Sequence, residues 1–369
     1  MRRKILALLM VAGMMVLGIV GCGQTGEIPN AGDQAQGNGQ TEESRQTEEN
    51  RQSGTQDSGQ SAPSQENNGV QASDSAGSNV PENTGVPVVY MTTDISSDGL
   101  MAIYEALGVS PEGSIAVKLS TGEPGSNYLR TDLIGELVQS LDATIVECNT
   151  AYGGSRSNTA MHYQVAEDHG YTAIATVDIM DEKGSMTLPV TGGSNLTENY
   201  VGANFANYDY FVVLSHFKGH AMAGYGGAIK NISIGIASSE GKEHIHTGGQ
   251  GGSMWSADQD AFLESMAEAG KSVVDYLDGN ILYINVMNRL SVDCDCDGSP
   301  SEPDMHDIGI LASFDPVALD QACIDLVYGA EDGGSLVKRI ESRNGLHTLE
   351  HAQEIGLGSR EYQLVSIDE

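Results

Sequence analysis

The chain has 369 residues, of which 51 are acidic and 18 are lysine or arginine, so its formal net charge is −33 at pH 7. This charge excludes a nucleic-acid phosphate backbone as the partner, because binding such a backbone requires a surface rich in lysine and arginine. An anionic small molecule would need a local pocket of cations, since the field of the whole chain repels it.

Residues 1–21 show the pattern of a secretory signal peptide. Basic residues 2–4 precede an apolar stretch, residues 5–20, that is short for a transmembrane helix. The segment Ile19-Val20-Gly21-Cys22 resembles the bacterial lipobox, in which the cysteine becomes the lipidated N-terminus. We therefore expect a lipoprotein that the lipid on Cys22 holds at the extracytoplasmic face of a bacterial cell membrane.

Residues 22–85 are expected to form a linker, and residues 86–369 a folded domain. Beyond its first residue the linker is rich in Gly, Ser, Gln, Asn, Thr and Glu and has few apolar residues. Such a segment buries too little surface to offset the entropy of ordering, so we predict a disordered tether. The remaining residues suffice for one large α/β domain or two closely packed lobes.

Expected strands and helices alternate in the first half of the domain, which favours an α/β fold with a largely parallel sheet and flanking helices. The expected strands are 86–91, 114–119 and 143–148, and the expected helices are 99–107, 130–141 and 159–169. Lys118 lies at the end of the second strand, and Arg156 follows the third. Both are candidates for binding an anion at the carboxyl edge of the sheet.

A buried strand at 210–214 leads into the part of the chain that is richest in histidine. His216 and His220 follow the end of this strand, where open α/β proteins place their ligands. His244 and His246 lie further on, and they would face the same side if the chain there were extended. We expect His216, His220 and His246 to contribute to a metal site.

A glycine loop separates the two pairs of histidines. Glycine allows the backbone to approach a ligand closely and to turn successive N–H groups toward an anion. Gly226 and Gly227 belong to this loop, and Lys230 and Asn231 follow it. These four residues are candidates for binding a small anion.

The second half of the domain continues the alternation of helices and strands. Asp315 and Pro316 form a helix start, with aspartate as the cap and proline in the first turn. The expected helices are 258–277, 315–328 and 348–355, and the expected strands are 281–286, 308–313 and 362–367.

Cys294 and Cys296 are the strongest local signal in this half. Two thiolates flanked by carboxylates are typical of a site for a borderline or soft metal such as zinc or iron. With Cys22 lipidated, an even number of cysteines remains in an exported protein, so a disulfide is the next interpretation. It would join Cys294 to Cys296 or link one of them to Cys148 or Cys323.

Calcium is a third possibility for the same loop. Residues 293–298 match the opening of a calcium-binding loop, and Asp304 falls at its twelfth position. The loop follows a strand instead of a helix, however, and Pro300 and Pro303 interrupt it. Calcium is therefore less favoured than zinc or iron.

Five segments of the domain form a recognisable set. They are HFKGH (216–220), GGAIKN (226–231), GK (241–242), DCDC (293–296) and DIGILASFDPVALD (307–320). Together they resemble the domain-of-unknown-function family 362, and the resemblance covers nearly all of residues 88–369. Many relatives are labelled iron–sulfur center proteins because they carry cysteine quartets. This chain has no such quartet, so an ordinary four-cysteine cluster is not expected. It also has Ser120 where relatives are expected to carry histidine, so the resemblance implies no role for that loop.

These expectations combine into a membrane-anchored metal-binding protein that acts on a small anionic ligand. The metal would lie near Cys294 and Cys296, and Lys230 and Asn231 would orient the anion beside it. As an enzyme, the protein would use the metal as a Lewis acid or as a redox centre. The alternative is a non-catalytic solute-binding lipoprotein, which a reversible ligand without turnover would favour.

Overall fold

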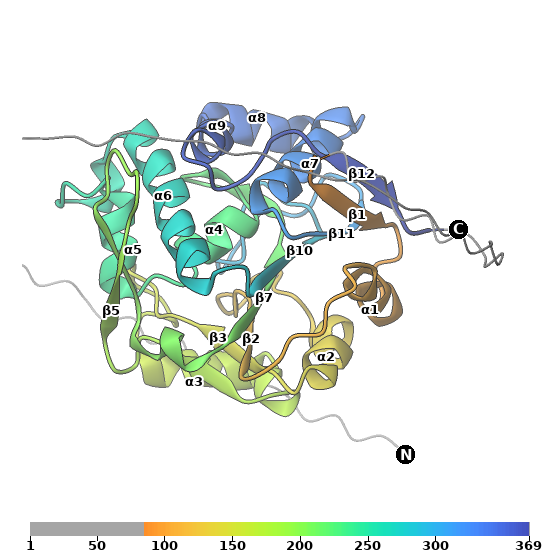
Figure 1. Ribbon diagram of the computed structural model, residues 1–369, viewed down its shortest axis with the longest axis horizontal. Coiled ribbons are helices and arrows are strands. Elements are labelled where there is room, and N and C mark those ends of the chain that lie inside the picture. The colour runs from red at the N-terminus through yellow and green to blue at the C-terminus, as the bar shows by residue number, and fades with distance from the viewer. Residues whose placement is uncertain (1–84, 369) are drawn as a thin grey trace, which may run out of the picture. The chain divides into compact units, whose positions relative to one another are not determined.

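The computed structural model describes residues 85–368. An eight-stranded sheet forms the centre of this part of the chain. The strands of this sheet are β1 (Val88–Thr92), β2 (Ile115–Lys118), β3 (Thr144–Glu147), β4 (Val177–Ile179), β7 (Tyr210–His216), β10 (Ile281–Met287), β11 (Gly309–Ser313) and β12 (Gln363–Ser366). Their order across the sheet is β12-β1-β11-β10-β7-β2-β3-β4 (Figure 1). The expected signal peptide, the lipidation site Cys22 and the linker up to residue 84 lie outside the described residues.

Five neighbouring strands of the sheet run parallel. β7 pairs in parallel with β2 on one side and β10 on the other, and β3 and β4 continue the parallel set beyond β2. β11 lies antiparallel between β10 and β1, and β12 runs parallel to β1. The prediction of an α/β fold with a largely parallel sheet is therefore confirmed.

Helices cover both faces of the sheet. The helices are α1 (Ser97–Ala106), α2 (Thr131–Ser140), α3 (Thr159–Asp168), α4 (Ala228–Ser233), α5 (Ser239–His246), α6 (Gln259–Leu277), α7 (Pro316–Gly329), α8 (Gly334–Ser342) and α9 (His347–Glu354). α1, α2 and α3 contribute buried residues to one apolar core, and α4, α6, α7, α8 and α9 contribute to the other. α5 packs with α6 in a smaller third cluster. Within residues 85–368, the helices lack the combination of length and apolarity that a membrane span needs.

The central strand β7 is apolar along most of its length because both of its faces are buried. Phe211 and Val213 belong to the core under α4 and α6, whereas Val212 and Leu214 belong to the core under α1 and α2. Successive side chains of a strand point to opposite faces, so a strand between two helical layers needs apolar residues throughout. This burial fixes the strand whose end carries the first histidine of the site.

Side-chain caps begin several helices where the sequence predicts them. Asp315 accepts hydrogen bonds from the N–H groups of Val317 and Ala318, with Pro316 in the first turn of α7. Asp258 caps α6 through the N–H group of Ala261. These bonds satisfy donors that a helix start would otherwise leave unpaired.

The chain around the second histidine pair is helical, which corrects the extended conformation considered above. Ser238 caps α5, and the helix contains both His244 and His246. Because a helix turns about 100° per residue, two residues that are two positions apart do not share a face. In the structure His246 is buried, whereas His244 is more exposed.

Two small hairpins extend the fold beyond the predicted elements. One pairs β5 (Ser185–Pro189) with β6 (Glu198–Gly202), and the other pairs β8 (Lys218–His220) with β9 (Gly224–Gly226). The second hairpin lies against the loop after β10. A Cβ atom on Gly219 would lie 2.4 Å from the carbonyl oxygen of Val292, so only glycine allows this close approach.

Candidate functional site

A pocket of about 580 Å³ lies at the carboxyl ends of β2, β3 and β7. Lys118, Glu147 and His216 are the last residues of these strands, and all three line the pocket. Parallel strands end at the same edge of a sheet, which is where open α/β proteins bind their ligands. The loop after β10, residues 293–298, also lines the pocket.

Every site residue predicted within the described part of the chain lines this pocket. These residues are Lys118, Arg156, His216, His220, Gly226, Gly227, Lys230, Asn231, His246, Cys294 and Cys296. The structure thus brings these residues together around one cavity. Their individual roles follow from the contacts that each side chain makes.

Two of the predicted cations are already paired with buried acids. Lys118 Nζ lies 3.0 Å from Glu147 Oε1, and Arg156 lies 3.5 Å from Glu147 Oε2 and 3.2 Å from Glu123 Oε1. Burial alone would raise the pKa of Glu147, but the charges of Lys118 and Arg156 outweigh this effect and lower the pKa to about 2. Lys118 and Arg156 thus have balanced charges, and they hold the end of β3 in place.

Asn231 supports this network instead of facing a ligand. Its Oδ1 accepts a hydrogen bond of 2.8 Å from Lys118 Nζ. Its Nδ2 donates to the carbonyl oxygens of Lys118 and Leu214 and to Ser215 Oγ, at 3.1 to 3.3 Å. The predicted ligand-binding role therefore does not match these contacts, because the amide group is fully used in joining the ends of β2 and β7.

The N–H groups after the glycine loop bind a carboxylate of the protein itself. Ala228 N and Ile229 N donate to Asp320 at 2.7 and 3.0 Å. A Cβ atom on Gly227 would lie 2.3 Å from Asp320 Oδ1, which explains the glycine at this position. The anion that these amides were expected to face is thus supplied by α7.

Lys230 is different, because its ammonium group makes no hydrogen bond or ion pair with any residue between 85 and 368. Burial, with a smaller contribution from nearby Arg156, lowers the pKa of Lys230 to about 8, although Glu147 partly opposes both effects. A second lysine, Lys242, also lines the pocket and donates to the carbonyl oxygen of Ala237 at 2.6 Å. Lys242 was not among the predicted site residues, although Gly241-Lys242 is one of the family segments.

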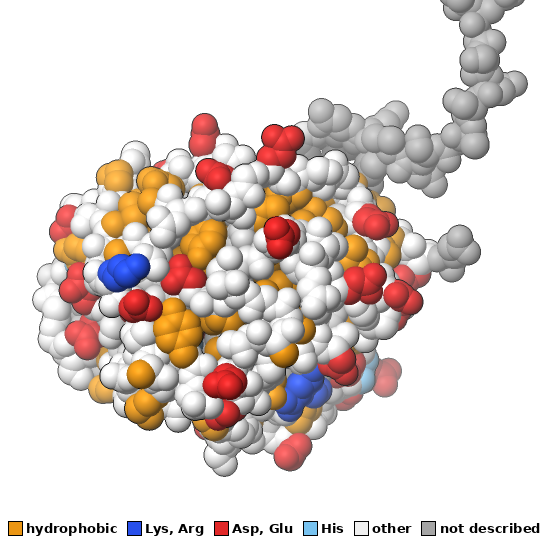
Figure 2. All heavy atoms as spheres, turned by 90° about the horizontal axis from the view of Figure 1, so that it is seen from below, with side chains coloured by type: hydrophobic (Ala, Val, Ile, Leu, Met, Phe, Trp, Pro, Cys, Tyr) orange, Lys and Arg blue, Asp and Glu red, His pale blue; other side chains and the backbone are white. Residues whose placement is uncertain are grey.

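The pocket cations contrast with the outer surface. Figure 2 shows one face of the molecule, on which acidic side chains are widely spread and lysine and arginine side chains are sparse. The pocket, by contrast, brings four cations together, namely Lys118, Arg156, Lys230 and Lys242, and five acids line it as well. The cations that could form the expected local site are therefore those that these acids do not pair with, Lys230 and Lys242.

His216 joins the end of β7 to the loop after β10. Its Nδ1 lies 2.9 Å from Asp295 Oδ2, and its Nε2 lies 2.9 Å from the carbonyl oxygen of Asn288. Both ring nitrogens face oxygen acceptors, so neither offers a lone pair to a metal. The predicted role of His216 as a metal ligand therefore does not match its contacts.

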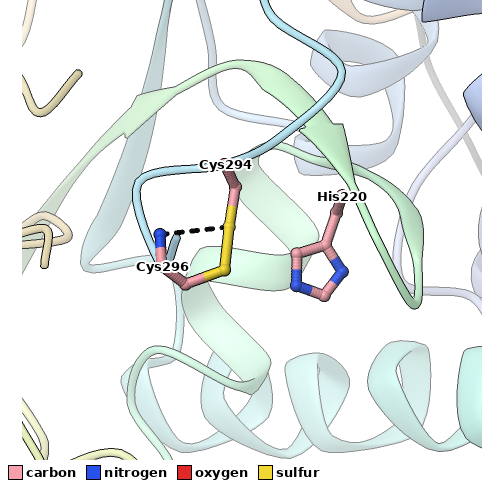
Figure 3. Close-up of side chains that lie close together, drawn as sticks. All are labelled: His220, Cys294 and Cys296. Atoms are coloured by element: carbon pink, nitrogen blue, oxygen red, sulfur yellow. Dashed lines mark hydrogen bonds between the residues drawn. A yellow bond between two sulfur atoms is a disulfide. The ribbon is translucent and has the colours of Figure 1, made fainter. Parts of the chain in front are cut away.

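His220 presents an N–H group to the cysteine pair. Its Nδ1 accepts hydrogen bonds from the N–H groups of Met222 and Ala223, at 3.3 and 2.9 Å. Burial holds the pKa of His220 well below its usual value, so the ring is neutral and its one proton is on Nε2. The ring edge that carries Nε2 faces the two sulfur atoms (Figure 3).

His246 belongs to α5 and is not part of the group that His220 forms with Cys294 and Cys296. Its Nδ1 donates to the carbonyl oxygen of Lys242 at 2.6 Å, and its ring stacks on Phe262 with 4.6 Å between the centroids. Burial lowers its pKa to about 4, so the ring is neutral near pH 7. Its Nε2 therefore retains a lone pair at the pocket wall.

Cys294 and Cys296 form a disulfide in the structure (Figure 3). The favoured prediction was a pair of free thiolates, and the disulfide within the pair was the next interpretation. The N–H group of Cys296 donates to Cys294 Sγ at 3.2 Å. Both residues are partly exposed, whereas the free cysteines Cys148 and Cys323 are buried.

His220, Cys294 and Cys296 form a possible metal-binding group, with ligand atoms within 4.8 Å of one another. The group fits a metal only in part. Reduction of the disulfide would supply two thiolates, which are good ligands for zinc and iron. The imidazole, however, faces the sulfurs with a protonated nitrogen, and two backbone N–H groups keep the proton away from Nδ1.

The aspartates of the same loop have partners within the protein, which does not favour calcium. Asp295 pairs with Lys218 at 2.7 Å as well as with His216. Asp293 pairs with Arg339 at 3.0 Å and accepts two hydrogen bonds from Ser301. Calcium binding would have to displace these contacts.

Comparison with known proteins gives a family but no reaction. The family model described as domain of unknown function (DUF362) matches residues 115–325. No curated protein matches the chain. Similar solved structures include the lactate racemase apoprotein from Thermoanaerobacterium thermosaccharolyticum, at 13% identity and a TM-score of 0.41. A structural-genomics protein from Thermotoga maritima matches at 11% identity and a TM-score of 0.35.

These structural matches are partial. The first covers 65% of this chain and 56% of the other protein, and the second covers 70% and 58%. The chain thus spans less than two thirds of either protein. Such distant likenesses carry no functional argument, so the pocket itself has to supply one.

Proposed function

This chain belongs to the DUF362 family, and we propose that its pocket binds a small organic anion through the ammonium group of Lys230. The observation that carries the proposal is the missing partner of this ammonium group among the described residues. Lys118 and Arg156 are balanced by Glu147 and Glu123, whereas Lys230 and Lys242 form no ion pair with an acid between residues 85 and 368. These two ammonium groups thus remain for a ligand, while the exposed Asp297 is a further acid in the lining.

The size and lining of the pocket favour an organic anion. Its volume of about 580 Å³ suits a ligand of metabolite size. Met254 and Trp255 line it from the 3₁₀ turn Met254–Ser256, and the side chain of Trp255 is 70% exposed. These side chains offer apolar contact to the carbon skeleton of a ligand, while the lysines bind its carboxylate or phosphate group.

The first prediction is that Lys230→Met weakens anion binding by about 10- to 100-fold, since a hydrogen bond to a charged group contributes about 1.5 to 3 kcal/mol. Calorimetry with a panel of dicarboxylates and phosphorylated C3 acids would find the ligand in the unchanged protein. The same titration of the variant then measures the loss.

A matched control is Lys183→Met, because Lys183 is exposed and lies outside the pocket. The control should keep the full affinity. The ammonium form of Lys230 binds the anion, so affinity should be full below about pH 8 and fall as the pH rises through this value. Equal affinities for the two variants would overturn the proposal.

We include the membrane anchor in this proposal. If Cys22 is lipidated as its sequence context predicts, the pocket faces the extracytoplasmic space on a tether. The protein then binds its ligand outside the cytoplasm, either as a solute-binding lipoprotein or as an enzyme. Turnover of the bound anion would distinguish the enzyme from the binding protein.

A thiolate–metal site is the second candidate, favoured by the closeness of His220, Cys294 and Cys296. The metal would supply Lewis-acid or redox chemistry beside the bound anion. Metal binding requires that the disulfide between Cys294 and Cys296 be reduced. His220 would also have to give up its present hydrogen bonds to act as a ligand. We therefore rank this candidate below anion binding.

The second prediction tests the metal site by elemental analysis of protein purified with and without air. If the site exists, the reduced protein should hold about one zinc or iron ion per chain, and the oxidised protein none. The double change Cys294→Ser and Cys296→Ser should empty it, and retention should weaken as the pH falls and the thiolates take up protons. A reduced protein that binds no thiophilic metal would remove this candidate.

A further inference from the structure

The disulfide and the free lysine line the same pocket. Cys294 and Cys296 belong to the loop after β10, and Lys230 belongs to α4, yet all three residues face one cavity. Any anion held by Lys230 is therefore confined with a partly exposed disulfide. Anion binding alone makes no use of the disulfide, and the metal site would require the disulfide to be reduced.

We propose that the Cys294–Cys296 disulfide exchanges with a small thiol that carries a carboxylate group. This inference rests on the proposed anion site, because Lys230 holds the carboxylate while the thiol reaches the disulfide. It adds a substrate class, an anionic thiol, and a redox activity to that site.

The contacts of the two sulfurs distinguish their roles. The N–H group of Cys296 donates to Cys294 Sγ at 3.2 Å. This bond stabilises negative charge on Cys294, which makes Cys294 the better leaving group and Cys296 the sulfur that is attacked. The Nε2–H group of His220 faces the same sulfurs and donates to the thiolate as it forms (Figure 3).

The exchange runs in two balanced steps. The thiolate of the small molecule attacks Cys296 Sγ, a new mixed disulfide forms, and the old sulfur–sulfur bond breaks with its electron pair on Cys294. A second thiolate then attacks the outer sulfur of the mixed disulfide and releases Cys296 as a thiolate. The two small thiols are oxidised to one disulfide, the cysteine pair is reduced, and the two protons of the thiols end on the two cysteines.

The experiment compares three thiols of different charge acting on the full chain. Mercaptoacetate is an anion, 2-mercaptoethanol is neutral and cysteamine is a cation, and each rate is corrected for its thiolate fraction and nucleophilicity. Differential alkylation and mass spectrometry of the peptide containing Cys294 and Cys296 follow the opening of this disulfide alone. The net charge of −33 by itself predicts that the cation reacts fastest and the anion slowest.

We expect the reverse order, with mercaptoacetate opening the disulfide at least 10-fold faster than 2-mercaptoethanol. Lys230→Met should abolish this preference and restore the order set by the net charge, whereas Lys183→Met should leave it unchanged. His220→Gln should slow all three thiols and keep their order, because His220 acts on the leaving sulfur and not on the carboxylate. An order of rates that follows the net charge in the unchanged protein would overturn the inference.

Calorimetry with succinate separates failure of this inference from failure of the anion site. Succinate has two carboxylates and no thiol, so its binding reports the anion site alone. If succinate binds and the thiols still react in the order set by the net charge, the anion-site proposal is supported and the exchange proposal is overturned. If neither succinate nor another thiol-free anion binds, and the rates of the three thiols also follow the net charge, both proposals are overturned.

Discussion

Replacing Glu147 by glutamine is expected to lower the free energy of unfolding by about 3 to 5 kcal/mol, the usual cost of breaking a buried ion pair from one side. Glu147 is 3% exposed and balances both Lys118 and Arg156. It also accepts hydrogen bonds from the N–H groups of Thr121 and Cys148. Glutamine keeps the shape but leaves Lys118 without an anionic partner, and urea denaturation followed by circular dichroism measures the loss.

The control for this variant is Glu105→Gln, because Glu105 is exposed on α1. Its effect should stay within about 0.5 kcal/mol, as for most surface changes. An equally small effect at Glu147 would show that the buried network contributes little net stability, and that the end of β3 is held by packing alone.

The same variant makes the acid sensitivity of the fold testable. The pKa of Glu147 is about 2 in the folded protein, below the ordinary value of 4.5. A lowered pKa contributes stability that is fully present above pH 4.5 and is lost as the pH falls toward 2. The unchanged protein and Glu147→Gln should therefore converge in stability across this range, because protonated glutamate resembles glutamine.

The location of the pocket was predictable because it depends on local sequence. Buried strands are apolar on both faces, and the polar residues at their ends, such as Lys118 and His216, mark the carboxyl edge of the sheet. Parallel pairing then brings these ends together without any further information. The predicted site residues consequently line one pocket.

The roles of individual residues were not predictable, because their partners lie far away in the sequence. His216 meets Asp295 across 79 positions, and Asn231 meets Lys118 across 113. No local pattern shows that these polar groups are already satisfied, so both residues looked available to a ligand. Lys230 looked no different, and only the structure shows that it lacks a partner among the described residues.

The conformation around His244 and His246 illustrates a second limit. An extended chain would place His244 and His246 on the same side, but both residues lie in the last turn of α5. Two contacts stabilise the helix: Ser238 caps it, and Ile245 packs against α6. The spacing of the two histidines reveals neither of these contacts, so it does not settle the local conformation.

The second large effect on stability is expected at Asp295, because this residue anchors the loop that carries the disulfide. Its carboxylate contacts Lys218 Nζ at 2.7 Å and His216 Nδ1 at 2.9 Å, and its carbonyl oxygen accepts from the N–H group of Glu123 at 2.8 Å. Burial would raise the pKa of Asp295, but His216 and Lys218 hold it well below its usual value. The carboxylate is thus ionised and joins the loop to β7 and β8.

Asp295→Asn is accordingly expected to lower the free energy of unfolding by about 3 to 5 kcal/mol, because Lys218 is left buried without its anionic partner. Lys218 is 1% exposed and would retain only the carbonyl oxygen of Asn127, at 3.1 Å. Urea denaturation measures the change, with the disulfide intact in both proteins.

Asp297→Asn is the matched control, since Asp297 lies two positions further along the same loop but is exposed. It should change the free energy of unfolding by no more than about 0.5 kcal/mol. If calcium held this loop together, both substitutions would remove a ligand, and both would weaken the protein only when calcium is present. Equal losses that depend on calcium would therefore contradict the ion-pair anchor, whereas a large loss at Asp295 alone, with or without calcium, would support it.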